Sequence, residues 1–161
     1  MAQVTTADIR TRIKNMIESD SVIAAINNIH ILDVAPMALA RGILPVVIIT
    51  DGNGTYDHNS MGNRYVKPSS NYTISLYAQE WNADPQAFIN AGLVDSFTTA
   101  LEDLMTKNHP MIYNGESLKG VRDAKLTSFT QVAPRSYPVN TQGQAYVHKS
   151  WQYQVTYQRG T

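Results

Sequence analysis

The sequence contains no cysteine, which excludes disulfide bonds and thiolate metal sites. It also lacks an excess of charge of either sign, since 13 basic residues balance 13 acidic ones, and no basic run occurs. General electrostatic binding to nucleic acid or to an anionic membrane is therefore not expected. No stretch approaches the ~20 apolar residues of a membrane helix, and the polar N-terminal segment lacks the apolar core of a signal peptide. These absences predict a soluble protein that is present, or assembled, in the cytoplasm.

The length of 161 residues indicates a single domain, residues 1–161, that is large enough to bury a substantial core. Apolar residues at helical spacing predict a helix over residues 6–19. Thr5 and Asp8 stand three residues apart at its start, as in a capping box. Val22, Ile23 and Ile26 suggest a second short helical turn.

The remaining pattern alternates strands with one long helix. Residues 29–34 and the apolar run 43–50 predict two strands, the second covered on both faces. Residues 72–79 and 146–158 alternate apolar and polar side chains, as half-buried strands do, and 118–132 predicts a less regular strand. A helix begins after Asp84-Pro85 and ends before Pro110.

This order predicts an α+β fold. Its sheet is largely antiparallel (mixed) and is flanked by an N-terminal helix and one long central helix. Long polar loops are expected at residues 51–70 and 134–145. A strand follows each of these loops, so neither is a linker between domains.

The first of these loops begins with a sequence that looks like a calcium-binding loop, DGNGTYDHNSMGNR. An EF-hand starting at Asp51 requires Gly at its sixth position and Glu at its twelfth. Tyr56 and Gly62 occupy those positions. The pattern therefore fails at the turn and at the bidentate ligand, and we expect a polar loop without a metal. Loops of this length in a compact domain are often functional.

No catalytic constellation is apparent either. The four histidines, at positions 30, 58, 109 and 148, are scattered and show no metal-ligand spacing. The GxSxG nucleophile elbow and the phosphate-binding patterns GxGxxG and GxxxxGK[ST] are absent. The sequence thus predicts no enzyme, no catalytic residue and no cofactor, and favours a protein of assembly.

Four local strings, in this order, carry a resemblance to a known family: LPVVIIT, YTISLYAQEW, VDSFTTALEDLM and WQYQVTYQR. With the N-terminal amphipathic helix, they resemble the tail terminator and tail-completion (neck) proteins of tailed bacteriophages. The resemblance covers residues 9–159 and rests on element order and local strings, none of which is a catalytic signature.

The resemblance implies a structural virion protein of the tail or neck, assembled in the host cytoplasm. Such a protein forms a homo-oligomeric, hexameric ring that caps the tail tube and ends its polymerisation. The ring then joins the tail to the head completion or connector protein, and genomic DNA passes through the lumen without specific binding. No cofactor and no membrane are implied.

On this interpretation the two loops make the ring contacts. They contain Arg and Tyr, which are enriched at binding hot spots. We expect these residues to contact the tube or the neighbouring subunit: Tyr56, Arg64, Tyr65, Lys67, Arg135, Tyr137 and Gln142.

Two alternatives remain open. The chain could be another neck component of a tailed phage, such as a head-closure or adaptor protein, which shares small size and ring assembly. A more distant alternative is a small soluble hydrolase that uses His58 or His148 with a nearby Asp.

Overall fold

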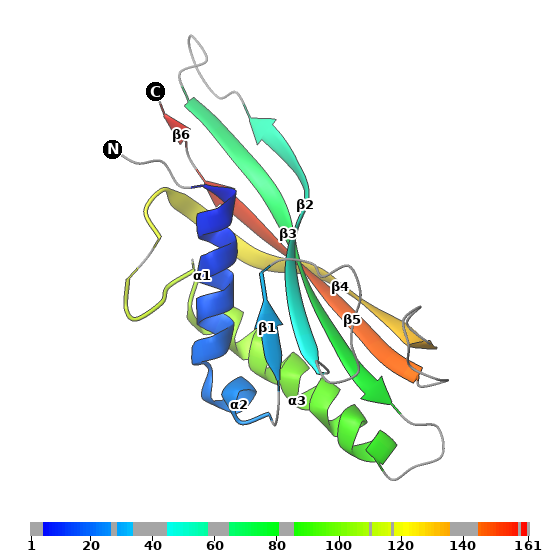
Figure 1. Cartoon of the computed structure of the whole chain (residues 1–161). Helices are drawn as coiled ribbons and strands as arrows, with labels where there is room; N and C mark the ends of the chain where they lie inside the picture. The colour runs from blue at the N-terminus through cyan, green and yellow to red at the C-terminus, as the bar shows by residue number, and fades with distance from the viewer. Residues whose placement is uncertain are drawn as a thin grey trace.

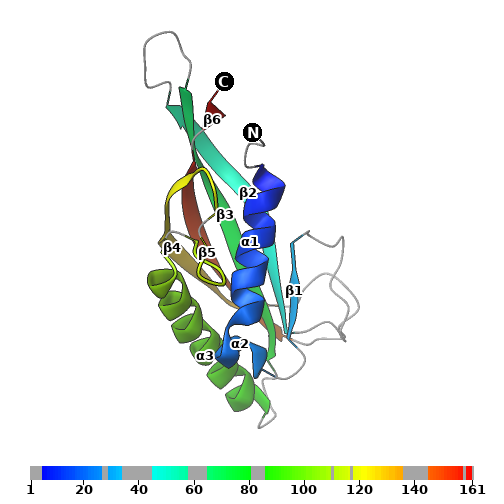
Figure 2. The ribbon, with the colours of Figure 1, turned by 90° about the vertical axis from the view of Figure 1, so that its left-hand side faces the viewer.

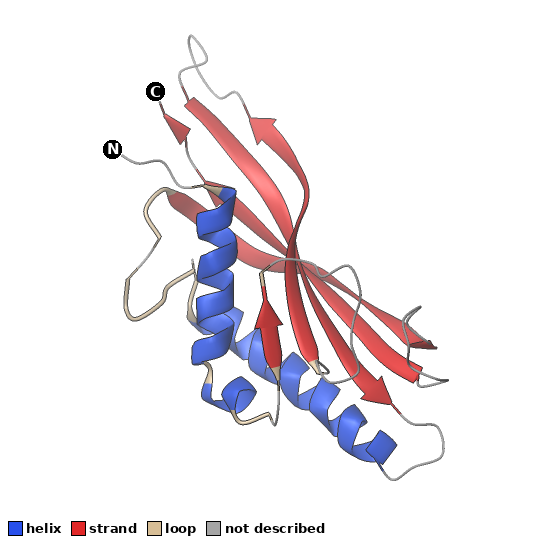
Figure 3. Cartoon of the chain, in the orientation of Figure 1, coloured by secondary structure: helices blue, strands red, loops and turns tan. Residues whose placement is uncertain are grey.

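The computed structural model describes residues 5–26, 29–33, 45–57, 65–80, 86–109, 111–116, 118–135, 145–157 and 159–160. They form the predicted α+β fold, a mixed sheet with helices packed on one face (Figures 1 and 3). The helices are α1 (Thr6–Ser19), α2 (Ser21–Ala24) and α3 (Gln86–Lys107). The strands are β1 (His30–Leu32), β2 (Val46–Asp57), β3 (Tyr65–Glu80), β4 (Val121–Arg135), β5 (Ala145–Tyr157) and β6 (Arg159–Gly160).

The sheet has the strand order β1-β2-β3-β5-β4, and β6 pairs with β3 away from this path. β1 is parallel to β2, while the β2–β3, β3–β5, β4–β5 and β3–β6 pairs are antiparallel. β3 is therefore the centre of the sheet, with an uninterrupted register to β5 from Ser69↔Thr156 to Glu80↔Ala145.

Helix α1 forms where the sequence predicts it, and its start is a complete capping box. The Thr5 hydroxyl accepts a bond from the Asp8 backbone N–H at 3.1 Å, and the Asp8 carboxylate accepts one from the Thr5 N–H at 2.9 Å. These bonds satisfy two amide donors that a helix end otherwise leaves unpaired. Asp20 ends α1, and its side chain in turn caps α2.

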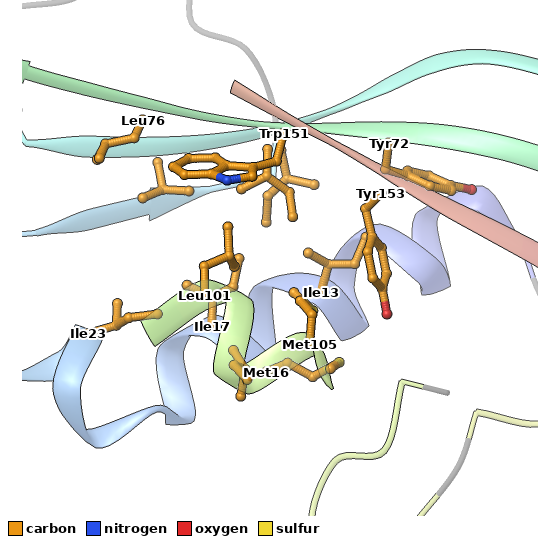
Figure 4. Packing of buried hydrophobic residues seen from close by; sticks show 14 of the residues in the cluster. Ile13, Met16, Ile17, Ile23, Tyr72, Leu76, Leu101, Met105, Trp151 and Tyr153 are labelled. Atoms are coloured by element: carbon orange, nitrogen blue, oxygen red, sulfur yellow. The ribbon is translucent and has the colours of Figure 1, made fainter. Parts of the chain in front are cut away.

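The core lies between the sheet and its helices (Figures 2 and 4). Trp151 of β5 is its largest fully buried side chain and packs against Phe97 of α3, with ring centroids 5.5 Å apart. The four apolar positions predicted to face one side of β3 are all buried: Tyr72, Ile74, Leu76 and Ala78. β2 is covered on both faces, as predicted, since Val46 to Ile49 are all buried.

The segment predicted as a loop at 51–70 is mostly strand, which corrects the sequence-based expectation. β2 continues to Asp57 and β3 already begins at Tyr65, so the two form a long hairpin. Their register shifts between Asp51 and Gly54, which marks a β-bulge. The glycines that suggested a loop fit a close approach instead, because a Cβ on Gly54 would lie 2.7 Å from the Ser69 carbonyl oxygen.

The second predicted loop is also shorter than expected. β4 continues through Pro134 and Arg135, and β5 begins at Ala145. Three register shifts interrupt the β4–β5 pairing, which explains why the sequence of β4 alternates poorly. Within the described segments, no helix has the length and apolar character needed to cross a membrane.

Candidate assembly surfaces

Four of the seven residues predicted to make contacts lie within the described part of the chain, where they form two groups. The backbones of Tyr56, Tyr65 and Lys67 belong to the hairpin of β2 and β3, and Arg135 is the last residue of β4. Three others lie outside the described residues, namely Arg64, Tyr137 and Gln142.

These two groups lie at opposite ends of the sheet. Tyr65 begins β3, whereas Glu80 ends it beside Ala145, and Arg135 is paired with the adjacent Tyr146. A strand of 16 residues such as β3 spans about 50 Å at ~3.3 Å per residue. The structure therefore separates the two groups of described residues along the full length of the sheet (Figure 1).

The hairpin projects beyond the N-terminal end of α1, and we call residues 52–57 and 65–71 the arm (Figures 1 and 2). At its base, Arg10 of α1 donates to both carboxylate oxygens of Asp51, at 2.7 and 2.9 Å. This charge-assisted pair joins α1 to β2 at the base of the arm. The first Asp of the calcium-like string thus makes an ion pair between a helix and a strand.

The sheet face opposite the helices, which we call the open face, carries neutral polar side chains along the middle of the β3–β5 ladder. Along β3 and β5 the directly opposed pairs are Asn71↔Gln154, Thr73↔Gln152 and Ser75↔Ser150. The Gln152 amide donates to the Thr73 hydroxyl at 3.1 Å, and the Thr156 hydroxyl donates to that of Ser69 at 3.4 Å. Cross-strand pairs of this kind stabilise the sheet without presenting a charge.

One end of the open face is aromatic and apolar. The rings of Tyr77 and His148 are stacked, with centroids 4.3 Å apart and planes 6° from parallel. Tyr77 also packs, with Leu32, against the buried Val46 and Ile48 of β2. His148 is thus part of a packed cluster on the sheet.

A groove runs between α3 and the outermost strand, β4. Its lining includes Glu102 and Thr106 of α3 and Leu126 and Phe129 of β4. Phe129 is 63% exposed, although its cross-strand neighbour Trp151 is buried.

Lys149 interrupts the row of apolar side chains that β5 directs toward the helices. Its ammonium group donates to the Thr98 hydroxyl of α3 at 3.1 Å. It also lies 5.0 Å from the centre of the Phe129 ring and 5.4 Å from that of Trp151, within the range of cation–π attraction. A cation is therefore accommodated on the helix-covered face by an α3 hydroxyl and two aromatic rings.

The fold perturbs the ionisation of Tyr153, a residue of β5. Burial raises the pKa of its phenol well above the ordinary value of 10, and the negative charge of Asp123 adds to the effect. The side chain is fully buried, and its hydroxyl has no hydrogen-bond partner within the described part of the chain. Tyr153 is thus a neutral core residue that retains a polar atom.

The described residues contain no group of three His, Asp or Glu side chains able to hold a metal ion. An imidazole–carboxylate pair does occur, since His109 Nε2 lies 2.7 Å from Asp123 Oδ1, but both side chains are nearly half exposed. This pair joins the turn after α3 to β4.

Sequence reasoning did not find the open β4 edge and its groove. The signal was present as Phe129, an aromatic residue in an uncharged run, SFTQV. The strand order that makes this run an edge is a property of the tertiary structure alone.

Comparison with solved structures finds chains of similar fold. No family model matches the sequence, and no curated protein matches it. A chain of the virion of a native gene transfer agent particle has a similar structure, with a TM-score of 0.44 and 11% identity. The similarity covers 96% of this chain and 99% of that one. Values this low do not establish a shared family.

Proposed function

We propose that this chain is a structural virion protein of a tailed, phage-like particle. In this proposal, several copies form a ring, six of them if the family resemblance holds, that caps the tail tube and ends its polymerisation. The ring joins the tube to the head connector, and DNA passes through its lumen. The subunit acts by shape and contact and performs no reaction.

The observation that carries this proposal is the distance between the arm and the β4–β5 end of the sheet. A neck ring must contact a tube on one side and a connector on the other. The arm and the β4–β5 end lie at opposite ends of a sheet that spans about 50 Å. One subunit can therefore reach two different partners without either contact obstructing the other.

The open face supports the same proposal. From Ser69 to Ser75, its β3–β5 ladder presents serine, threonine, asparagine and glutamine side chains and no charge. Lys125 of β4 lies beside this ladder, opposite Gln154. The ladder itself offers no Lys or Arg, the residues on whose phosphate contacts DNA affinity mainly depends. Such a face suits a passage through which DNA slides.

The proposal is tested by native mass spectrometry and negative-stain imaging of the purified chain, alone and mixed with preassembled tail tubes. We expect six-fold rings, either free or at the tube ends. Adding the chain to polymerising tube subunits should stop elongation. Monomers that neither decorate tube ends nor stop elongation would contradict the proposal.

A further inference from the structure

Part of the outer edge of β4 lacks the features that normally prevent a sheet edge from pairing with another strand. β4 is the last strand in the sheet order, so its outer backbone groups have no strand partner among the described residues. Proteins protect such edges with charges, prolines or bulges. β4 has its bulges before Ser128 and after Val132, and the five residues between them keep a regular register with β5.

We call this run, Ser128–Val132, the edge window. Its sequence, SFTQV, contains no charge and no proline, and Phe, Thr and Val all favour strands. Ser128, Phe129 and Thr130 are exposed. The window therefore has the backbone, side chains and accessibility that favour addition of another strand.

The same sheet has a second open edge, the outer side of β2. β1 pairs with β2 only from Val46 to Ile48, and beyond Ile48 no described strand lies on the outer side of β2. β2 carries two acidic residues, Asp51 and Asp57, and no basic one. β4 carries three basic residues and one acidic residue.

We propose that the edge window of one copy pairs with the outer edge of β2, beyond Ile48, of a second copy. This inference rests on the proposed ring and specifies its subunit contact. Because the two edges differ, the contact is head-to-tail, which is the type that generates closed rings. Pairing β4 with β4 would bring its excess of basic residues together, whereas β2 carries no basic residue.

The absence of cysteine provides a direct test. Thr130→Cys is combined in one chain with Thr50→Cys, Asn53→Cys or Thr55→Cys, and a short bismaleimide is added. Within one subunit these positions are separated by three strand spacings of ~4.8 Å. Linkage to Thr55 is further prevented because Thr130 is aligned through β5 and β3 with Ile48, seven residues away. We expect at least one double variant to give covalent ladders up to the ring size, and each single variant to give none.

A matched pair of lysine substitutions tests the edge without cross-linking. Thr130→Lys places a charge in the window and should weaken assembly by about tenfold or more, as judged by the protein concentration at which rings dissociate. Thr99→Lys makes the same change at an exposed position of α3 and should leave assembly unchanged. Circular dichroism confirms that both variants are folded.

The outcomes separate this inference from the proposed function. Covalent dimers from Thr130→Cys alone would show a β4–β4 contact and overturn the inference. Rings that form normally with Thr130→Lys and give no ladder with any cysteine pair would also overturn it, while the proposed function stands. A wild-type chain that forms no ring, alone or on tubes, would remove both.

Discussion

The two faces of the sheet use alternate residues of the same strands for different purposes. On β5, Trp151, Tyr153 and Val155 are buried beneath the helices, whereas Ser150, Gln152 and Gln154 form the open face. The helix-covered face stabilises the fold by removing apolar area from water. The open face is held by cross-strand pairs worth at most about 1 kcal/mol each. Substitutions one residue apart on β5 should therefore have very different effects.

The largest effect is expected for Trp151→Ala, on the helix-covered face. Removing the buried indole leaves a cavity beside Phe97 and should lower the free energy of unfolding by about 3–5 kcal/mol. Urea denaturation measures the loss. The control is Gln152→Ala, the next residue but on the open face, for which we expect a loss below about 1 kcal/mol. Equal losses for the two variants would remove the distinction between the faces.

A smaller effect is expected where the arm requires glycine. Gly54→Ala would place a Cβ 2.7 Å from the Ser69 carbonyl oxygen and 3.0 Å from the Ser70 Cα, so the backbone must move. We expect a loss of about 1–3 kcal/mol in unfolding free energy, as for other overpacking substitutions. Thr55→Ala, on the same strand and exposed, is the control. If both variants have wild-type thermal midpoints, the close approach of β2 to β3 is not needed for stability.

Tyr153→Phe tests a buried hydroxyl that has no hydrogen-bond partner among the described residues. At neutral pH the variant should be as stable as the wild type or up to about 1 kcal/mol more stable, because a buried hydroxyl without a partner costs free energy. The pKa of this phenol is raised in the folded state, so above pH 10 the unfolded chain loses the proton while the folded chain keeps it. Tyr153 therefore reduces stability progressively as pH rises above 10.

Denaturation midpoints measured from pH 7 to pH 11 follow this behaviour. The gap between Tyr153→Phe and the wild type should widen above pH 10. A constant gap would mean that the phenol ionises equally in both states, and that burial does not control it.

The smallest effect belongs to the open face itself. A double-mutant cycle of Thr73→Val and Gln152→Leu isolates the bond that joins β3 to β5 at this level. We expect a coupling of about 0.5–1 kcal/mol, because the bond lies on a partly exposed sheet face. A coupling of several kcal/mol would assign the open face a main role in stability.

Much of the fold follows from local patterns in the sequence. The α1 capping box, the buried rows of β3 and β5 and the α+β order were all predicted, since each depends on neighbours a few residues apart. The predicted loop at 51–70 was wrong because glycine and asparagine were taken as turn residues. Gly54 is needed because β3, 15 residues further along the chain, passes within contact distance.

The candidate surfaces were less accessible to such reasoning. The seven predicted contact residues were chosen by type and loop position, and their role as contacts stays a prediction. The sequence does not reveal which strand ends the sheet, because β5 follows β4 in the chain but lies between β3 and β4. The β4 edge is therefore visible only after folding, although its uncharged window can be read from the sequence.

The long, uninterrupted register of β3 with β5 has a mechanical consequence. A pull between the tip of the hairpin and the far end of the sheet acts along the strands, so the hydrogen bonds between them are loaded in shear. Bonds loaded in this way share the force and fail together, whereas bonds peeled from one end fail one after another. Each subunit would then resist extension between the two partners bound at its opposite ends.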